Sequence, residues 1–227
     1  MEIWIKGAPN GSLTLSDVKI TPERVREFLE ECGFPLADGD WLNVLHGDAW
    51  KGKIYHLYVN VGGEKWSVQG IIRRPTVDVV VTVSDGKRTY VLFTEQYREL
   101  YRAKIVANPA GGIDSQETAE EAARREAAEE TGLPPASLKL KALGKPVAAS
   151  PGTIKEEAHF FLAKAQLSST ELDAYLERWK NTQQGLAEEG ERITIIPVLA
   201  VELKRFVSGL EPHDAKMELG LSRAGLC

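Results

Sequence analysis

The sequence is poor in cysteine and contains no long apolar run. Its two cysteines, Cys32 and Cys227, are far apart, and neither lies in a Cys-x-x-Cys or Cys/His spacing. They are therefore expected to be free thiols in a reducing compartment. No run of 18 apolar residues exists, so no membrane-spanning helix is predicted. The first residues, MEIWIKGAPNGSL, lack the apolar region of a signal peptide. We therefore expect a cytoplasmic protein.

The sequence also lacks an excess of positive charge. Its 28 basic and 33 acidic residues give a formal net charge of −5, which argues against nucleic-acid binding by a basic surface. A nucleotide substrate is not excluded, because a bound metal ion can reverse the local field. With 227 residues, 43% of them hydrophobic, the chain can form one large domain or a domain with a smaller subdomain.

The apolar pattern divides the chain into residues 1–72 and 73–227. The first part is predicted to be a small subdomain of antiparallel strands with a helix that Thr21 caps. The second part has few helices in irregular order, which predicts a mixed α+β arrangement, an α/β layer fold without regular alternation. Strands are expected at 2–6, 41–46, 53–61, 65–72, 79–83, 88–95, 138–143, 158–164 and 193–198. Helices are expected at 21–32, 117–131, 168–179, 199–207 and 214–224, a hairpin turn at 62–64 and a polar loop at 183–191.

One segment concentrates carboxylates on a predicted helix. Residues 111–133 read GGIDSQETAEEAARREAAEETGL. Glu126, Glu129 and Glu130 are three or four residues apart, so they share one helix face. Like charges at this spacing cost an isolated helix roughly 0.2–0.5 kcal/mol per pair. A cation on that face would remove the cost, and clustered hard oxygen ligands suit Mg²⁺ or Mn²⁺.

The spacing of this segment resembles the Nudix box, Gly-x5-Glu-x7-Arg-Glu-U-x-Glu-Glu-x-Gly-U, in which U is aliphatic. Every fixed position is met, although Ala127 is small for an aliphatic position. The fixed positions are Gly111, Glu117, Arg125, Glu126, Glu129, Glu130 and Gly132. The alternative is a solvated acidic helix stabilised by Glu120–Arg124 and Glu121–Arg125 pairs. The full spacing disfavours that alternative.

The resemblance implies a loop–helix–loop that binds a divalent metal. Glu126, Glu129 and Glu130 would then form the metal-binding face, with the Ala110 carbonyl as a backbone ligand, and Glu129 is also a candidate catalytic acid. Arg125 and Glu117 would hold the loop to the helix, and Gly111 and Gly132 would allow a tight backbone. The implied fold is a Nudix α/β/α sandwich with a mixed sheet. In such enzymes the N-terminal sheet, here 1–72, helps to form a homodimer and the adenine pocket.

The flanks resemble the ADP-ribose and ADP-sugar pyrophosphatase branch of that family. Gln96-Tyr97-Arg98 is similar to its Gln-x-Arg signature, and residues 107–111 to its Glu-x-Pro-Ala-Gly signature. Ala107 stands where the branch has Glu, so one acidic contact is missing. Arg98, beside Gln96, is a candidate phosphate clamp.

Two adjacent arginines, Arg73 and Arg74, precede a proline at the junction of the two predicted parts. They would contact phosphate or would simply be solvated, and the sequence leaves these alternatives equal.

A second acidic candidate follows the segment 150–152, Ser-Pro-Gly. Residues 155–163, KEEAHFFLA, resemble a run of the same branch in which a loop glutamate activates water. The register assigns that role to Glu156, with Glu157 as the alternative. His159 is expected to be a packed core histidine. Residues 185–191 and Asp214-Ala215-Lys216 resemble further features of ADP-sugar diphosphatases.

These resemblances imply a Mg²⁺-dependent Nudix hydrolase, with Mn²⁺ as a possible substitute. Its substrate would be a nucleoside-diphosphate sugar, ADP-ribose or another ADP-sugar, cleaved to AMP and sugar phosphate. A homodimer is expected, without nucleic-acid or membrane partners. One alternative is a Nudix hydrolase of different specificity, for GDP-sugars, NADH or dinucleoside polyphosphates. The other is a non-catalytic nucleotide-binding module, which would not need the full set of carboxylates.

Overall fold

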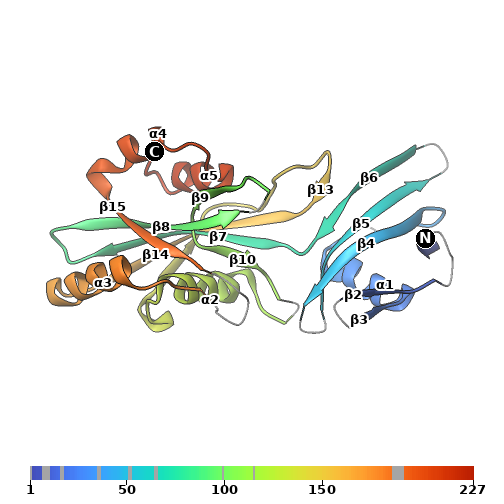
Figure 1. Ribbon diagram of the computed structural model, residues 1–227, viewed down its shortest axis with the longest axis horizontal. Coiled ribbons are helices and arrows are strands. Elements are labelled where there is room, and N and C mark those ends of the chain that lie inside the picture. The colour runs from blue at the N-terminus through green and yellow to red at the C-terminus, as the bar shows by residue number, and fades with distance from the viewer. Residues whose placement is uncertain are drawn as a thin grey trace. The chain divides into compact units, whose positions relative to one another are not determined.

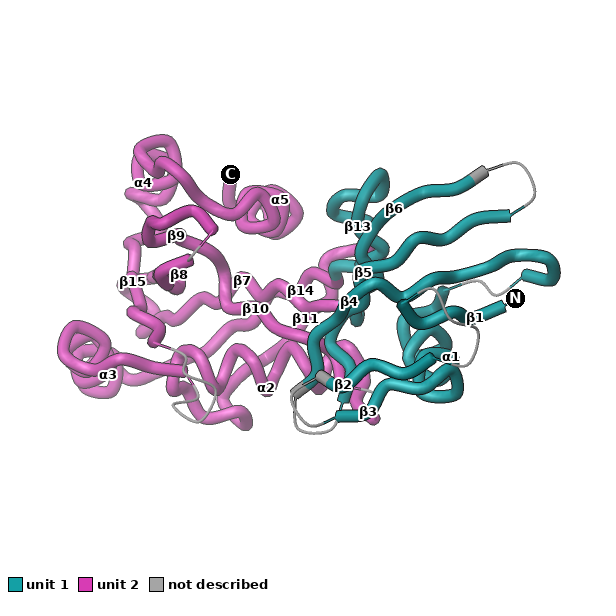
Figure 2. The backbone as a smooth tube through the Cα atoms, turned by 45° about the vertical axis from the view of Figure 1, so that its right-hand side comes forward, with its two compact units in different colours: residues 1–75, 147–158 teal, residues 76–146, 159–227 magenta. Residues whose placement is uncertain are grey.

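In the computed structural model the chain forms two compact units (Figure 2). The described residues are 2–6, 11–15, 18–34, 37–50, 53–63, 66–98, 100–114, 116–185 and 192–227. Unit 1 comprises residues 1–75 and 147–158, and unit 2 comprises residues 76–146 and 159–227. The last part of the expected turn at 62–64 and residues 186–191 of the expected loop lie outside the described residues.

Unit 1 is built on a sheet with the strand order β1-β4-β5-β6-β13. Its strands are β1 (Glu2–Ile5), β4 (Trp41–Trp50), β5 (Lys53–Gly63), β6 (Trp66–Arg73) and β13 (Ile154–Lys155). β4, β5 and β6 are antiparallel, but β1 runs parallel to β4 and β13 runs parallel to β6. The expected antiparallel strands are therefore present as β4, β5 and β6, and a parallel strand adds to each edge of them. A parallel pair needs a crossover connection, and the segment between β1 and β4 contains a helix that makes one.

That helix, α1 (Pro22–Glu31), covers one face of the sheet with the hairpin of β2 (Leu13–Leu15) and β3 (Val18–Ile20). Thr21 caps it by accepting a hydrogen bond from the backbone of Arg24, and Pro22 occupies the first turn. Val25, Phe28 and Leu29 are buried against the sheet. The core of unit 1 therefore lies between α1 and one face of the sheet.

Unit 2 is built on a second sheet, with the strand order β11-β14-β7-β8-β15. β10 pairs with β7, β9 with β8, and β12 with β14. The strands are β7 (Thr76–Ser84), β8 (Thr89–Arg98), β9 (Ala103–Ala107), β10 (Ala110–Gly112), β11 (Lys139–Ala142), β14 (Glu157–Gln166) and β15 (Thr194–Leu199). β12 (Val147–Ala148) and the first two residues of β14, with which it pairs, are counted in unit 1. The helices are α2 (Ala119–Thr131), α3 (Ser169–Asn181), α4 (Leu203–Ser208) and α5 (Ala215–Arg223), with short 3₁₀ turns η1 (Pro135–Ser137) and η3 (Ala200–Glu202).

The helices of unit 2 cover both faces of this sheet. α2 and α3 lie on one face, and α4 and α5 lie on the other (Figure 1). The side chains of β7 alternate accordingly, because successive residues of a strand point to opposite faces. Val77, Val79 and Val81 join the core under α2 and α3, whereas Asp78 and Val80 meet α5 near Gly220. Within the described residues no helix is long and apolar enough to cross a membrane.

Candidate metal site

Helix α2 has a capped start and a left-handed end. Thr118 and Glu121 form a capping box, in which each side chain accepts a hydrogen bond from the backbone of the other residue. Gly132 ends the helix with a φ of 70°, a conformation that favours glycine. Because Glu121 is engaged in the cap, it does not form the Glu121–Arg125 pair of the acidic-helix alternative.

Arg125 joins the helix to the loop before it. Its guanidinium donates through Nε and Nη2 to the carboxylate of Glu117, and through Nη2 to the carbonyl of Gly112 at 3.0 Å. These hydrogen bonds to Glu117 raise the pKa of Arg125. Nη1 also donates to Glu126 at 2.6 Å and to Glu129 at 3.3 Å. The fixed fork of the guanidinium thus ties three carboxylates and one strand carbonyl together.

The strand β10 passes closely over the helix at Gly111. A Cβ atom added to Gly111 would overlap all three atoms of the Glu126 carboxylate, whereas one added to Gly112 would meet no atom within 4 Å. No positive φ is involved at either residue. Gly111 is therefore required for space, since the Glu126 carboxylate occupies the position that any side chain there would take.

Glu130 reaches the same strand from the next helix turn. Its Oε2 accepts a hydrogen bond from the backbone amide of Ala110 at 3.2 Å, and the residue is buried. Glu126 and Glu130 therefore meet β10 at consecutive residues, Gly111 and Ala110. Two carboxylates therefore lie at one strand, and carboxylate oxygens are the ligands that Mg²⁺ and Mn²⁺ prefer.

Arg125 also explains why the carboxylates are not gathered more tightly. Among the described residues no three acidic, histidine or cysteine side chains converge closely enough to hold a metal ion as they stand. Glu126 and Glu129 both accept from Arg125 Nη1. The donor types fit a divalent metal, and Glu126 and Glu129 would have to turn from Arg125 towards it.

The Gln-x-Arg segment lies at the end of β8. Gln96 and Arg98 pair with Ile105 and Ala103 of β9. By strand alternation both share a face with Leu92, which belongs to the core under α2 and α3. The side chain of Arg98 is exposed. The two residues therefore lie on the face of the sheet that carries the box helix.

The other candidate residues belong to unit 1. Arg74 is buried, pairs with Glu31, donates from Nε to the carbonyl of Ile54 at 2.8 Å and lies over the ring of Phe28. These contacts connect α1 to the sheet and engage the guanidinium inside the unit. Arg74 is therefore not available to a phosphate in this arrangement.

Arg73 and the loop acids form separate ion pairs in unit 1. Arg73 is half-exposed and pairs with the buried carboxylate of Glu156 at 3.0 Å. Glu157 is exposed and accepts from Lys155 at 3.3 Å. Of the two adjacent acids, Glu156 therefore has the more enclosed and constrained carboxylate.

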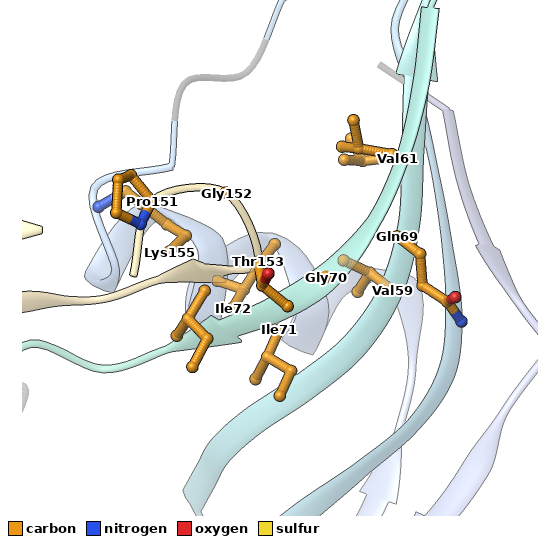
Figure 3. A pocket seen from close by; sticks show the side chains of 12 residues that line it. Val59, Val61, Gln69, Gly70, Ile71, Ile72, Pro151, Gly152, Thr153 and Lys155 are labelled. Atoms are coloured by element: carbon orange, nitrogen blue, oxygen red, sulfur yellow. The ribbon is translucent and has the colours of Figure 1, made fainter. Parts of the chain in front are cut away.

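A pocket lies beside this loop (Figure 3). Residues 151–155 and strands β5 and β6 surround a volume of about 100 Å³. The loop is fixed to β6 because the amide of Ile71 donates to the carbonyl of Thr153 at 2.9 Å, and Gly70 leaves no room there for a Cβ. Sites for small organic ligands usually measure ~300–1,000 Å³, so this pocket is too small to enclose a nucleoside diphosphate.

Sequence reasoning missed one buried polar pair, Asp78 and Asn108. Burial raises the pKa of Asp78 to about 7, although a hydrogen bond from Asn108 opposes the shift. The Oδ1 atom of Asn108 has no hydrogen-bond partner among the described residues. The available signal was a carboxylate inside the apolar run of residues 77–81, VDVVV, because a buried strand rarely accepts an unpaired charge.

Comparisons with known proteins agree with the geometry of α2 and its loop. Residues 72–206 match the NUDIX domain family. An ADP-ribose pyrophosphatase of Bacillus subtilis (strain 168) is 30% identical over 169 residues, which cover 73% of this chain and 82% of that protein. A crystal structure of an ADP compounds hydrolase matches with a TM-score of 0.50 at 13% identity, over 81% of this chain and 89% of that one. At this identity the structural match supports the fold alone.

Proposed function

Because the chain belongs to the NUDIX family, we propose that this Nudix hydrolase is Mg²⁺-dependent and cleaves the diphosphate of an ADP-sugar, with ADP-ribose as the first candidate. The products would be AMP and a sugar phosphate. The observation that carries this proposal is the meeting of Glu126 and Glu130 with β10 at Gly111 and Ala110. The ADP-ribose pyrophosphatase among the relatives supports the choice of substrate class.

In this proposal Glu126, Glu129 and Glu130 hold the metal, with the Ala110 carbonyl as a further ligand. When bound, the metal supplies charge neutralisation for the diphosphate and a nucleophilic water near neutral pH. Arg125 and Glu117 keep the loop on the helix, so the carboxylates stay near β10. Holding these groups in place beforehand spares the reaction the cost of reorganising them.

Arg98 is proposed to bind the phosphates, with Gln96 beside it on the same face of β8. A guanidinium suits this role because its planar fork matches two phosphate oxygens. Replacing Arg98 with Lys would keep the charge and lose the fork. We expect a higher KM for the substrate in that variant, with little change in thermal stability, because the side chain is exposed.

The water-activating acid is proposed to be Glu156, with Glu157 as the alternative. Arg73 is assigned to holding Glu156, since the two form an ion pair. Glu156→Gln should lower kcat far more than it changes KM, because a general base acts in the chemical step. If Glu157→Gln gives this result and Glu156→Gln does not, the assignment moves by one residue.

The metal assignment is tested with a matched pair of variants on α2. Glu130→Gln should abolish metal-dependent turnover and leave the fold, as judged by circular dichroism. Glu120→Gln is the control, because Glu120 lies on the same helix with an exposed carboxylate that contacts only Arg124 in the described contacts. Unchanged turnover in Glu130→Gln would remove Glu130 from the metal site.

A substrate panel tests the specificity. ADP-ribose, ADP-glucose, GDP-mannose and NADH would each be incubated with Mg²⁺ or Mn²⁺, and the nucleotide product identified by chromatography. The highest kcat/KM should be found for an ADP-sugar, with AMP as product. Preference for GDP-mannose or NADH would transfer the proposal to another specificity. No hydrolysis of any of the four would support a non-catalytic binding module instead.

A further inference from the structure

We propose that Asp78 and Asn108, supported by helix α5, are positioning residues that hold the segment 108–112 in place for the metal carboxylates. The inference rests on the proposed metal site. It assigns a role to a buried polar pair and to the C-terminal helix. The described contacts of Asp78 and Asn108 lead to each other, to α5 and to the ladder of β10 and β7, so both groups would act through the backbone of Ala110 and Gly111.

The pair itself is deeply buried and directly bonded. Asp78 is 2% exposed and Asn108 is 1% exposed. Asn108 donates from Nδ2 to Oδ1 of Asp78 at 2.7 Å, and the same nitrogen lies 3.5 Å from the carbonyl of Met217 in α5. The side chain of Asn108 thus connects strand β7 with the backbone of α5.

The backbone on either side of Asn108 is also fixed. The carbonyl of Pro109 accepts from the amide of Val79 at 2.8 Å. Ala110 and Gly111 then pair with Asp78 and Val77 in the antiparallel ladder of β10 and β7. Asp78 is therefore bonded to Asn108 through its side chain and stands opposite Ala110 in the same ladder. A change at Asp78 or Asn108 would be transmitted over two residues to the strand that Glu126 and Glu130 meet.

Helix α5 packs against Asp78 and Asn108 at Gly220. A Cβ atom at Gly220 would lie 2.8 Å from Oδ1 of Asp78 and 2.9 Å from Nδ2 of Asn108. The start of α5 is held as well, because Asp214 accepts from the amide of Lys216 at 2.7 Å and its own amide donates to the carbonyl of Val106 at 3.0 Å. The Asp214–Lys216 segment therefore fixes α5 beside β9.

The two sets of contacts reach the segment 108–112 from opposite faces of the sheet. Glu126 and Glu130 come from α2 on one face, and Asp78 and Asn108 meet α5 on the other face (Figure 1). A short strand held from one face alone could shift towards or away from it. Contacts on both faces set its position within the tolerance of a few tenths of an ångström that metal coordination requires.

A positioning role also explains why a carboxyl group stands in this strand. Its neighbours Val77, Val79 and Val81 are buried valines, and valine at position 78 would avoid the cost of burying a carboxyl group. That cost is visible in the raised pKa of Asp78. Groups that cost stability are expected where they serve the site.

The test compares two substitutions at position 78 in the full chain. Asp78→Asn can keep a hydrogen bond to Asn108, whereas Asp78→Val removes it and adds a residue that suits the strand. The probe is Mn²⁺ alone, titrated without substrate, with free Mn²⁺ followed by electron paramagnetic resonance. Asp78→Val should weaken Mn²⁺ binding about 10- to 100-fold, the loss usual for groups behind a metal ligand. Asp78→Asn should restore it to within about threefold of wild type.

A second pair of variants tests the contribution of α5. Gly220→Ala adds a methyl group that presses on Asp78 and Asn108, although alanine favours the helix. It should weaken Mn²⁺ binding in the folded protein, and the crowding should lower the melting temperature by more than the helix propensity of alanine raises it. Ser222→Ala is the control, because Ser222 is exposed on the same helix and its replacement should leave Mn²⁺ binding unchanged.

The outcomes separate this inference from the metal site on which it rests. If the wild type binds Mn²⁺ and the Glu130→Gln variant does not, the metal site is established. With that established, unchanged Mn²⁺ affinity in folded Asp78→Val would overturn the positioning role. An equal loss in Asp78→Asn and Asp78→Val would overturn it too, because the hydrogen bond would then be irrelevant. If wild type binds no Mn²⁺, the proposed function itself has failed.

Discussion

Replacing Gly111 with alanine is expected to lower metal-dependent activity about 100-fold and to leave the fold intact. The new Cβ would overlap the Glu126 carboxylate. Carbon and oxygen atoms in contact lie about 3.5 Å apart, so the carboxylate would have to shift by roughly 1 Å or more. The backbone at Gly111 has no positive φ, so alanine itself adds no backbone strain. The substitution therefore displaces one side chain and little else.

The displacement is large on the scale of metal coordination. Mg²⁺ demands near-ideal geometry with oxygen ligands at about 2.0–2.1 Å, and a 1 Å misplacement of a reacting group costs about 100-fold. We therefore expect the Mg²⁺ concentration for half-maximal activity to rise, and kcat/KM to fall about 100-fold. The free energy of unfolding should change by less than about 1 kcal/mol, because the end of a glutamate side chain turns easily.

Gly112→Ala provides the matched control for this experiment. It makes the same chemical change at the next residue of β10, where a Cβ meets no atom within 4 Å. Both variants would be assayed for hydrolysis over a series of Mg²⁺ concentrations and for unfolding in urea. Wild-type activity in Gly111→Ala would refute the reasoning. So would an equal loss in Gly112→Ala, since this would indicate a general effect on β10.

Three further predictions concern charge and burial. The pKa of Asp78 is raised from 3.8 to about 7, so between these two values the folded protein binds more protons than the unfolded chain. The free energy of unfolding should therefore fall as the pH rises from about 4 to 7, by at most about 4 kcal/mol. Urea unfolding at pH 5 and pH 8 should show this fall in wild type and a smaller one in Asp78→Asn, and equal slopes would contradict it. Cys32 is buried, and its pKa is raised to about 12, whereas Cys227 is exposed. A thiol reagent at pH 8 should therefore label Cys227 in the folded protein and Cys32 only after denaturation. Fast labelling of both cysteines in the folded protein would contradict this prediction. Arg125→Lys should lower stability by about 1–3 kcal/mol, because lysine cannot donate to Glu117 and the Gly112 carbonyl together; unchanged urea unfolding would argue against that linking role.

Local sequence determined where most helices and strands form. Thr21 and Pro22 mark the start of α1, and the predicted and observed helices agree closely there. The start of α2 was expected at residue 117, whereas the capping box of Thr118 and Glu121 begins it at Ala119. Such contacts join residues three or four apart, so their chemistry is present in any short segment of the chain.

Strand pairing was harder to predict from the sequence, because it joins residues that are distant in the chain. The parallel pair of β1 and β4 joins residues separated by the whole of α1. The pairing of β13 with β6 places residues 147–158 in unit 1, with a segment more than 70 residues earlier in the chain. Alternation of apolar residues specifies which face of a strand is buried. It does not specify the neighbouring strand or its direction.

The candidate site divides in the same way. The sequence by itself indicated the family, through the resemblance of residues 111–133 to the Nudix box. The helix period also places Glu126, Glu129 and Glu130 on one helix face. Only the tertiary structure decided that Glu126 lies against Gly111, that Glu130 accepts from Ala110, and that Asp78 and Asn108 meet α5. Each of these contacts requires separate elements to pack within hydrogen-bonding or van der Waals distance, and no repeat in the sequence encodes that approach.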